Sequence, residues 1–368
     1  MLKQHPRQHG NIGVLLNFTA LTEFSVTSLP EYEINIVVDE RGVSTSSTRK
    51  EVCVCEVEMQ DGRSMSCTLD KEGFCLIGHR YNHINYYCNK EVVEKYYPEL
   101  ESRIKSEIPN ASKVVVFAHQ VRSWRKDIQD MSVSSGSLAP KGPVQFCHTD
   151  FSIQGAISRL KSMAVDPDEV TGGTGNGTPN PGGRCGSDIP PPGPLRRVLT
   201  RQQVDEYLNG RRFIILHAWR NIVEDALQWH PLGLCCADTV EDADLLAYDL
   251  TYTQASSDTP TGRLSCMMVR HNSRQKWVSY PAMCRDELLL FKQFDSHADF
   301  TRKHGLTSPC ERLPGELWDD DTPGKFISCF APHSAFDNTN GASTTDTDTA
   351  HPPVGRESIE AGVIVLLD

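Results

Sequence analysis

The sequence lacks several features that would assign it to a familiar class of protein. Its 48 aspartates and glutamates outnumber its 37 lysines and arginines, giving a formal net charge of −11. It therefore has no basic surplus for binding a nucleic acid or an anionic membrane. No apolar run approaches membrane-spanning length, and the first residues, MLKQHP, lead into no apolar segment of the kind found in signal peptides. We expect a soluble, cytoplasmic protein.

Common catalytic and metal-binding motifs are also missing. There is no CxxC framework, no Walker lysine after the glycine-rich stretch, no Gly-x-Ser-x-Gly elbow and no HExxH. The 13 cysteines are scattered, and the close pairs are Cys53/Cys55 and Cys235/Cys236. This pattern indicates reduced thiols, many of them small core residues, rather than a disulfide scaffold or a zinc finger.

Short apolar runs separated by turn residues predict a mainly β protein. Residues 51–59 alternate as a half-buried strand does, residues 113–118 form a continuous apolar run, and residues 358–367 are rich in β-branched side chains. Helical spacing occurs at 89–106, and Thr200 is a natural cap for a helix that ends near residue 208. Flanking helices around two groups of short strands predict a distorted double-stranded β-helix, a cupin-like jelly roll.

Two further segments complete the expected secondary structure. Residues 237–249 mix acidic side chains with apolar residues compatible with a helix, and residues 263–270 and 276–280 resemble a pair of strands. We expect one domain over residues 1–368, in which residues 1–50 form an N-terminal extension. The Gly/Pro-rich segment 165–195 is predicted to be a disordered insertion, with a lid as the alternative, and residues 338–354 a polar loop.

Two distant segments carry the residue types of one metal site. His148 and Asp150 would point to the same side of a strand, because side chains alternate along it. His333 lies in a later apolar segment, and Arg356 and Ser358 follow after one loop. Two imidazoles and one carboxylate suit iron(II) and leave positions open around the metal. An arginine beside a hydroxyl can hold a carboxylate, so the pattern predicts an iron(II) site at which Arg356 and Ser358 anchor 2-oxoglutarate.

The sequence leaves alternatives open at several of these positions. The distal ligand could come from other histidines, namely His217, His271, His297 and His304. Chain order favours His333, because Arg356 follows it closely, whereas a core histidine is the simpler interpretation of His217. Cys147 should face away from the ligands. Arg356 could instead form a surface ion pair with Glu357 or Glu360, although its spacing with Ser358 favours a shared strand face.

Four other residues are candidates for a substrate pocket: Trp219, Arg220, Trp277 and Tyr280. Core packing explains the aromatic residues equally well. Arg220 lies in an apolar stretch and must be paired if it is buried, either structurally or with an acidic group of a substrate.

Eight stretches, in consistent order, carry a family resemblance: 66–77, 146–152, 216–222, 231–238, 276–281, 286–296, 332–337 and 356–360. They resemble the fungal AsaB-like hydroxylase/desaturase family, which includes relatives of gibberellin desaturase-type and cephalosporin methoxylase-related chains. The resemblance implies a jelly roll, iron(II), 2-oxoglutarate as cosubstrate and O2, with ascorbate as reductant in vitro. Two positions depart from the family pattern, His217 in place of an asparagine and Gly362 in place of an arginine.

The expected function is therefore an iron(II)/2-oxoglutarate-dependent oxygenase that hydroxylates, desaturates or oxidatively cyclises a secondary metabolite. The resemblance implies a polyketide, terpenoid or meroterpenoid as this small hydrophobic substrate, and release of succinate and CO2. We expect neither a nucleic acid nor a membrane as partner. The alternative is a non-catalytic ligand-binding or partner protein on the same scaffold, because a fold does not fix a function.

Overall fold

The computed structural model of the protein describes ten segments: 11–19, 33–38, 44–46, 52–80, 84–123, 142–165, 196–254, 260–305, 326–337 and 356–368. The predicted insertion, from residue 166 to 195, and the predicted polar loop at 338–354 lie outside the described residues. No helix in the described segments is long and apolar enough to cross a membrane.

Two β-sheets make up most of the described chain. The smaller sheet has five strands, in the order β5 (Phe74–Gly78), β13 (Glu287–Asp295), β8 (Phe213–Asn221), β15 (Glu357–Leu367) and β6 (Ala111–Ser123). The larger has ten, in the order β1 (Ile12–Thr19), β4 (Val52–Asp61), β12 (Trp277–Ser279), β9 (Leu232–Cys235), β14 (His333–Ala335), β7 (His148–Thr149), β11 (Pro260–Val269), β10 (Leu245–Gln254), β2 (Glu33–Val38) and β3 (Ser44–Ser46).

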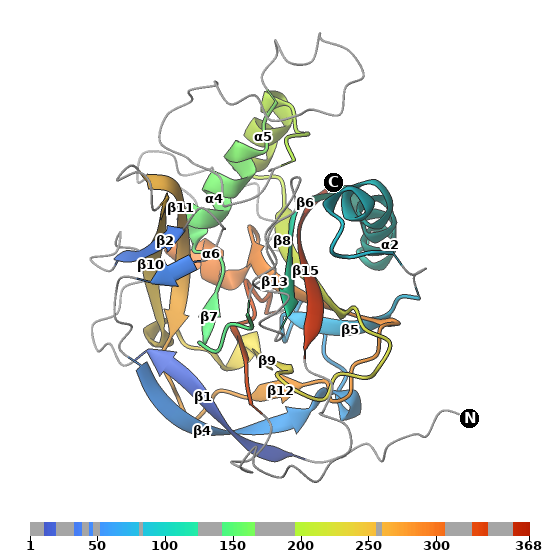
Figure 1. Ribbon diagram of the computed structural model, residues 1–368. Coiled ribbons are helices and arrows are strands. Elements are labelled where there is room, and N and C mark those ends of the chain that lie inside the picture. Colours follow the sequence, from blue (N-terminus) through green and yellow to red (C-terminus); the bar gives the residue numbers. More distant parts are fainter. Residues whose placement is uncertain are drawn as a thin grey trace.

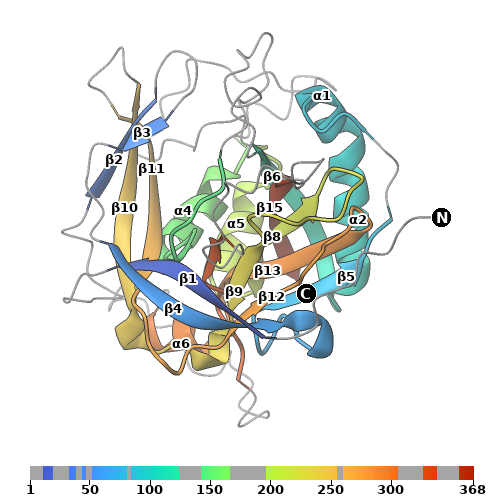
Figure 2. The same ribbon diagram turned by 60° about the horizontal axis from the view of Figure 1, so that its bottom comes forward.

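The helices are short and flank these sheets (Figure 1). They are α1 (Asn89–Glu91), which continues through a π-helical turn, η2 (Val92–Tyr96), into α2 (Tyr97–Glu107), and then α4 (Ile153–Ser162), α5 (Arg201–Leu208) and α6 (Asp299–His304). Single 3-10 turns occur at η1 (Gly62–Ser64), η4 (Ala237–Thr239) and η5 (Asp242–Asp244). In both ribbon views, β10 and β11 lie on the opposite side of the molecule from α2 and β5 (Figures 1 and 2).

The five-stranded sheet is covered on both faces, which explains its apolar sequence. All nine residues of β8 are buried. On the outer face Leu216 and Ile359 pack in one cluster with Leu100 of α2. A strand that is buried on both sides has a nearly continuous apolar sequence.

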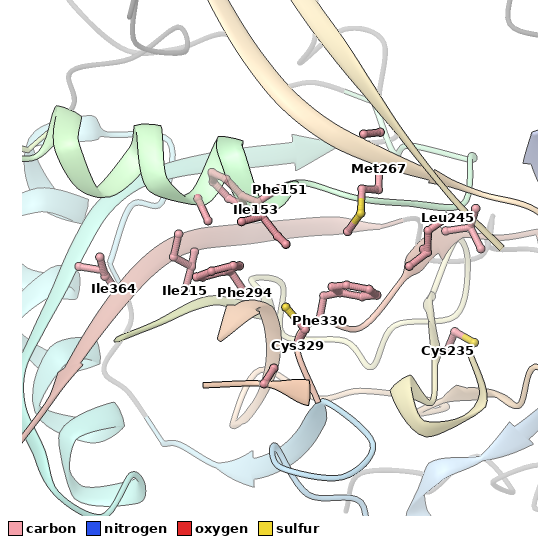
Figure 3. Close-up of a cluster of buried hydrophobic side chains, with 14 of the residues drawn as sticks. Phe151, Ile153, Ile215, Cys235, Leu245, Met267, Phe294, Cys329, Phe330 and Ile364 are labelled. Carbon is pink, nitrogen blue, oxygen red and sulfur yellow. The ribbon is translucent and has the colours of Figure 1, made fainter. Parts of the chain in front are cut away.

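The main core lies between the two sheets. Ile215, Phe294 and Ile364 of the smaller sheet belong to the same buried cluster as Leu245 and Met267 of the larger one, and Figure 3 shows these side chains spread across the interior of the fold. Two facing, curled sheets with helices outside confirm the predicted mainly β jelly roll.

Most predicted elements are present, with some differences. Residues 237–249 form two 3-10 turns and the start of β10, so their helix-like composition does not produce an α-helix. Residues 263–270 and 276–280 do contain strands, but these do not pair with each other, since β11 pairs with β10 and β7, and β12 with β4 and β9. The region expected as an extension supplies β1, β2 and β3.

Candidate metal centre

His148, Asp150 and His333 come together where β7 and β14 pair. His333 lies directly opposite His148 in the register of these strands, and Asp150 follows β7 immediately. His148 Nε2 is 3.5 Å from Asp150 Oδ1, and His333 Nε2 is 3.4 Å from Asp150 Oδ2. One ligand atom from each residue lies within 4.8 Å of the others, which is the spacing that a single metal ion needs.

Backbone groups hold both imidazoles in the orientation required for a metal ligand. The Nδ1 of His148 lies 2.6 Å from the carbonyl oxygen of Phe146, and that of His333 lies 3.2 Å from the carbonyl oxygen of Ala331. A carbonyl only accepts, so each Nδ1 donates, and the lone pair of each Nε2 is left for a metal.

The backbone of Asp150 is also fixed on both sides. Its N–H donates to Gln293 Oε1 at 3.0 Å, and the Cys266 thiol donates to its carbonyl oxygen at 3.0 Å. Two neutral imidazoles and one carboxylate, oriented before any metal arrives, fit the donor set of a non-haem iron(II) site.

The charges around the cluster favour the protonation states of metal ligands. Burial would raise the pKa of Asp150, but the surrounding histidines, His217 foremost, hold it well below its usual value. Burial, together with the neighbouring His148, lowers the pKa of His333. A metal ion binds deprotonated side chains, so these ligands need to release few protons when the metal binds.

Arg356 and Ser358 form the second half of the predicted site. The Arg356 side chain is buried, and its Nε donates to Ser358 Oγ at 3.0 Å. Its guanidinium lies 5.1 Å from the ring centre of Trp219. Its Nη1 is buried with no hydrogen-bond partner among the described residues. Burial and the nearby Arg122 lower the pKa of Arg356 to about 9, despite the opposing charge of Glu360.

A buried guanidinium that lacks a counterion is costly unless an anion completes it. The fork of Arg356, with the hydroxyl of Ser358 beside it, has the chemistry to bind a carboxylate in the interior of the fold. The sequence pattern is therefore not the sole support for binding of the far carboxylate of 2-oxoglutarate at Arg356. The buried Nη1, which has no partner among the described residues, also supports it.

Of the four candidate pocket residues, Trp219 alone contacts Arg356 in the described part of the chain. Arg220 lies on the opposite face of β8, where its Nη2 donates to the carbonyl oxygen of His79 at 2.7 Å. Trp277 packs edge-on against Phe18 in the main core. Tyr280 packs against Phe74 in the cluster that also contains Trp219.

The rival histidines occupy different surroundings. His271 lies against the ring of Phe18, His297 contacts the carbonyl oxygen of Gly210 at 3.0 Å, and His304 contacts Asp242 at 2.8 Å. His217 does lie beside the cluster, 3.3 Å from Asp150 Oδ2.

The sequence did not assign Gln293 or Arg122 to the site, and it named Glu360 merely as an alternative ion-pair partner of Arg356. Glu360 was detectable, because it follows Arg356 and Ser358 at the same two-residue spacing and so shares their strand face. Gln293 and Arg122 come from other strands, and no local pattern marks them.

Comparison with known proteins places the chain in a family. The family described as "YDMC: Oxidoreductase/YMDC permease-like domain" matches residues 16–172 and 192–312, which include His148 and Asp150 but not His333 or Arg356. The chain is 23% identical over 263 residues to the alpha-ketoglutarate-dependent dioxygenase phiK of Fungal sp. (strain ATCC 74256), covering 70% of this chain and 77% of that protein. It is 27% identical over 273 residues to the hydroxylase/desaturase efuI of Hormonema carpetanum, again covering 70% and 77%.

Comparison with solved structures supports the fold described above. The iron and alpha-ketoglutarate-dependent endoperoxidase NvfI superposes with a TM-score of 0.59, at 16% identity, over 97% of both chains. A second structure of this protein gives a TM-score of 0.58 at 14% identity, over 97% of this chain and 98% of the other. These relatives confirm the expected resemblance to fungal hydroxylase/desaturases, and the chain belongs to the oxidoreductase/YMDC permease-like domain family.

Proposed function

We propose that this protein is an iron(II)/2-oxoglutarate-dependent oxygenase that hydroxylates, desaturates or oxidatively cyclises a small secondary metabolite in the cytoplasm. The single observation that carries the proposal is the pairing of two features inside one fold. A two-histidine, one-carboxylate cluster lies at β7 and β14, and Arg356, a buried arginine that forms no ion pair with a described residue, lies immediately before β15. An iron ion and a dicarboxylate cosubstrate account for both features at once.

Each residue has a distinct task in this account. His148 and His333 would present Nε2 to the metal, and Asp150 would supply the carboxylate. Arg356 and Ser358 would bind the far carboxylate of 2-oxoglutarate. When iron and 2-oxoglutarate are bound, O2 would be the oxidant, and 2-oxoglutarate would be oxidised to succinate and CO2 and so supply two of the electrons that O2 accepts.

The surrounding side chains orient the cosubstrate and exclude water. Trp219 lies beneath the guanidinium of Arg356 and closes that side of the site. Phe291 packs edge-on against His333, with ring centres 4.9 Å apart, so the distal ligand has an apolar neighbour. A dry site strengthens the charge interactions that hold a carboxylate and prevents side reactions.

The substrate class follows from the relatives and not from the site itself. The relatives phiK and efuI are named as a dioxygenase and a hydroxylase/desaturase, which supports oxidation of a small molecule. We extend this to a polyketide, terpenoid or meroterpenoid.

The direct test is succinate release from 2-oxoglutarate by the purified protein with iron(II), O2 and ascorbate, without an added substrate. We expect slow release in the wild type and none in Asp150→Ala. No release by the metal-loaded protein, combined with unchanged binding of 2-oxoglutarate when the metal is removed, would instead favour a ligand-binding protein on the same scaffold.

A further inference from the structure

A second group of ionisable side chains lies against the candidate metal ligands. His217 Nδ1 is 2.9 Å from Glu360 Oε1 and 3.3 Å from Asp150 Oδ2. The side chains of His217 and Glu360 are each 11% exposed. The imidazole therefore lies between two carboxylates in the interior, and one of them is the predicted carboxylate ligand.

The sheet register explains how these residues meet. His217 on β8 is opposite Gly362 on β15, and Glu360 is opposite Trp219, so His217 and Glu360 lie on one face of the sheet. That face is turned toward β7, where Asp150 lies. At residue 362 a side chain would collide with Phe117, since an added Cβ would lie 2.5 Å from its ring.

The ring of His217 has little freedom to turn. Phe291 and Phe151 both pack edge-on against it, with ring centres 5.6 and 6.3 Å away. Glu360 makes the shorter contact and is itself 3.9 Å from Arg122. The ring is thus fixed by aromatic packing on its sides and by a carboxylate at Nδ1.

We propose that His217 and Glu360 are a positioning pair for the metal ligand Asp150, with Glu360 acting through His217. This rests on the proposed function, because Asp150 must be a ligand for its orientation to matter. Asp150 Oδ1 faces His148, while Oδ2 faces both His333 and His217. A contact at Oδ2 restrains rotation of the carboxylate, so that it meets the metal in one orientation.

Residues that orient a metal ligand typically change metal affinity by about 10–100-fold when they are replaced. His217→Phe keeps the aromatic packing and removes the polar contact, so we expect iron(II) to bind about 10–100-fold more weakly. His217→Asn places an amide N–H near the position of Nδ1 and should restore affinity to within about fivefold of the wild type. Because Glu360 acts through His217, adding Glu360→Leu to His217→Phe should weaken iron(II) binding no further.

The experiment is an anaerobic titration of the full-length metal-free protein with iron(II), repeated with cobalt(II) to record its visible ligand-field bands. The matched control is His119→Phe. His119 is a mostly buried histidine on β6 that contacts Tyr97 and no residue of the site. This control should leave both the affinity and the cobalt bands unchanged. Thermal unfolding of each variant checks that it is folded, and the double variant removes the Glu360 carboxylate, which His217→Phe alone would leave with Arg122 as its charged neighbour.

Two results would overturn the proposal. If folded His217→Phe binds iron(II) within twofold of the wild type, with unshifted cobalt bands, then His217 only fills space. If the wild type binds two metal ions per chain and His217→Phe binds one, Asp150, His217 and Glu360 form a second metal site instead. Failure of the proposed function is distinct, because the wild type would then bind no iron(II) or His148→Ala would bind it unchanged.

Discussion

Replacement of Arg356 separates binding of the cosubstrate from stability of the fold. The guanidinium is fully buried and keeps one internal bond to Ser358, and its Nη1 has no hydrogen-bond partner among the described residues, a position that the cosubstrate would fill. Removing one partner of such a desolvated charge pair costs about 2–5 kcal/mol. In Arg356→Met the dissociation constant of 2-oxoglutarate should therefore rise about thirty- to several-thousand-fold.

The same replacement should not lower the free energy of unfolding of the metal-free protein. With no carboxylate bound, Arg356 is a buried charge that forms no ion pair with a described residue, so replacing it by an apolar residue of similar length is neutral or stabilising. Arg356→Lys keeps the charge but loses the two-pronged geometry, and we expect an intermediate loss of affinity. Ser358→Ala removes one hydroxyl and should cost about 1 kcal/mol.

The assay is an anaerobic titration of the iron-loaded protein with 2-oxoglutarate, followed by its metal-to-ligand charge-transfer absorption. Arg220→Lys is the matched control, because Arg220 is equally buried but pairs with His79 on the other face of β8. The Arg220→Lys variant should be less stable than the wild type and should keep its affinity for 2-oxoglutarate. Unchanged affinity in Arg356→Met would refute the reasoning and leave Arg122 as the nearest other cation.

Three further predictions follow from the structure. His148→Ala, Asp150→Ala and His333→Ala should each abolish turnover and weaken iron binding in equilibrium dialysis, while circular dichroism stays unchanged. Asp295 is fully buried with Lys292 Nζ 2.6 Å away, so Asp295→Asn should cost about 3–5 kcal/mol in urea unfolding without altering iron affinity. Burial lowers the pKa of His119 from 6.5 to about 4. The unfolded chain thus binds this proton first, and up to about 3 kcal/mol of stability should be lost as the pH falls from about 6.5 to 4. In His119→Phe the free energy of unfolding should fall less steeply as the pH is lowered over the same range. An unchanged slope would show that other groups cause the loss.

The proximity of the candidate site residues was largely predictable because their arrangement depends on local patterns. His148 with Asp150, and Arg356 with Ser358, are each two residues apart, and on a strand this spacing places both members on one side. His333 followed from chain order. The structure brings His148, Asp150 and His333 within reach of one ion, and it joins Arg356 to Ser358.

Features that depend on distant parts of the chain were not predictable. The parallel pairings of β4 with β12 and of β2 with β10 join segments far apart in sequence, and no local pattern specifies them. The helix α4 carries a glycine, Gly155, which lowers its helical propensity. A tertiary contact explains this glycine, because a Cβ at residue 155 would lie 2.2 Å from the carbonyl oxygen of Ser265. His217 was considered as a ligand or as a core histidine. It is buried between Asp150 and Glu360, and no local pattern brings these two carboxylates to it.

The most direct test of the central claim is a crystal structure of the protein grown without oxygen in the presence of manganese(II), as a stand-in for iron(II), and 2-oxoglutarate. The account predicts one metal ion bound by Nε2 of His148, Nε2 of His333 and the carboxylate of Asp150. The far carboxylate of 2-oxoglutarate should lie on Arg356 and Ser358. A metal bound elsewhere, or a 2-oxoglutarate molecule that leaves Arg356 without a partner, would contradict it.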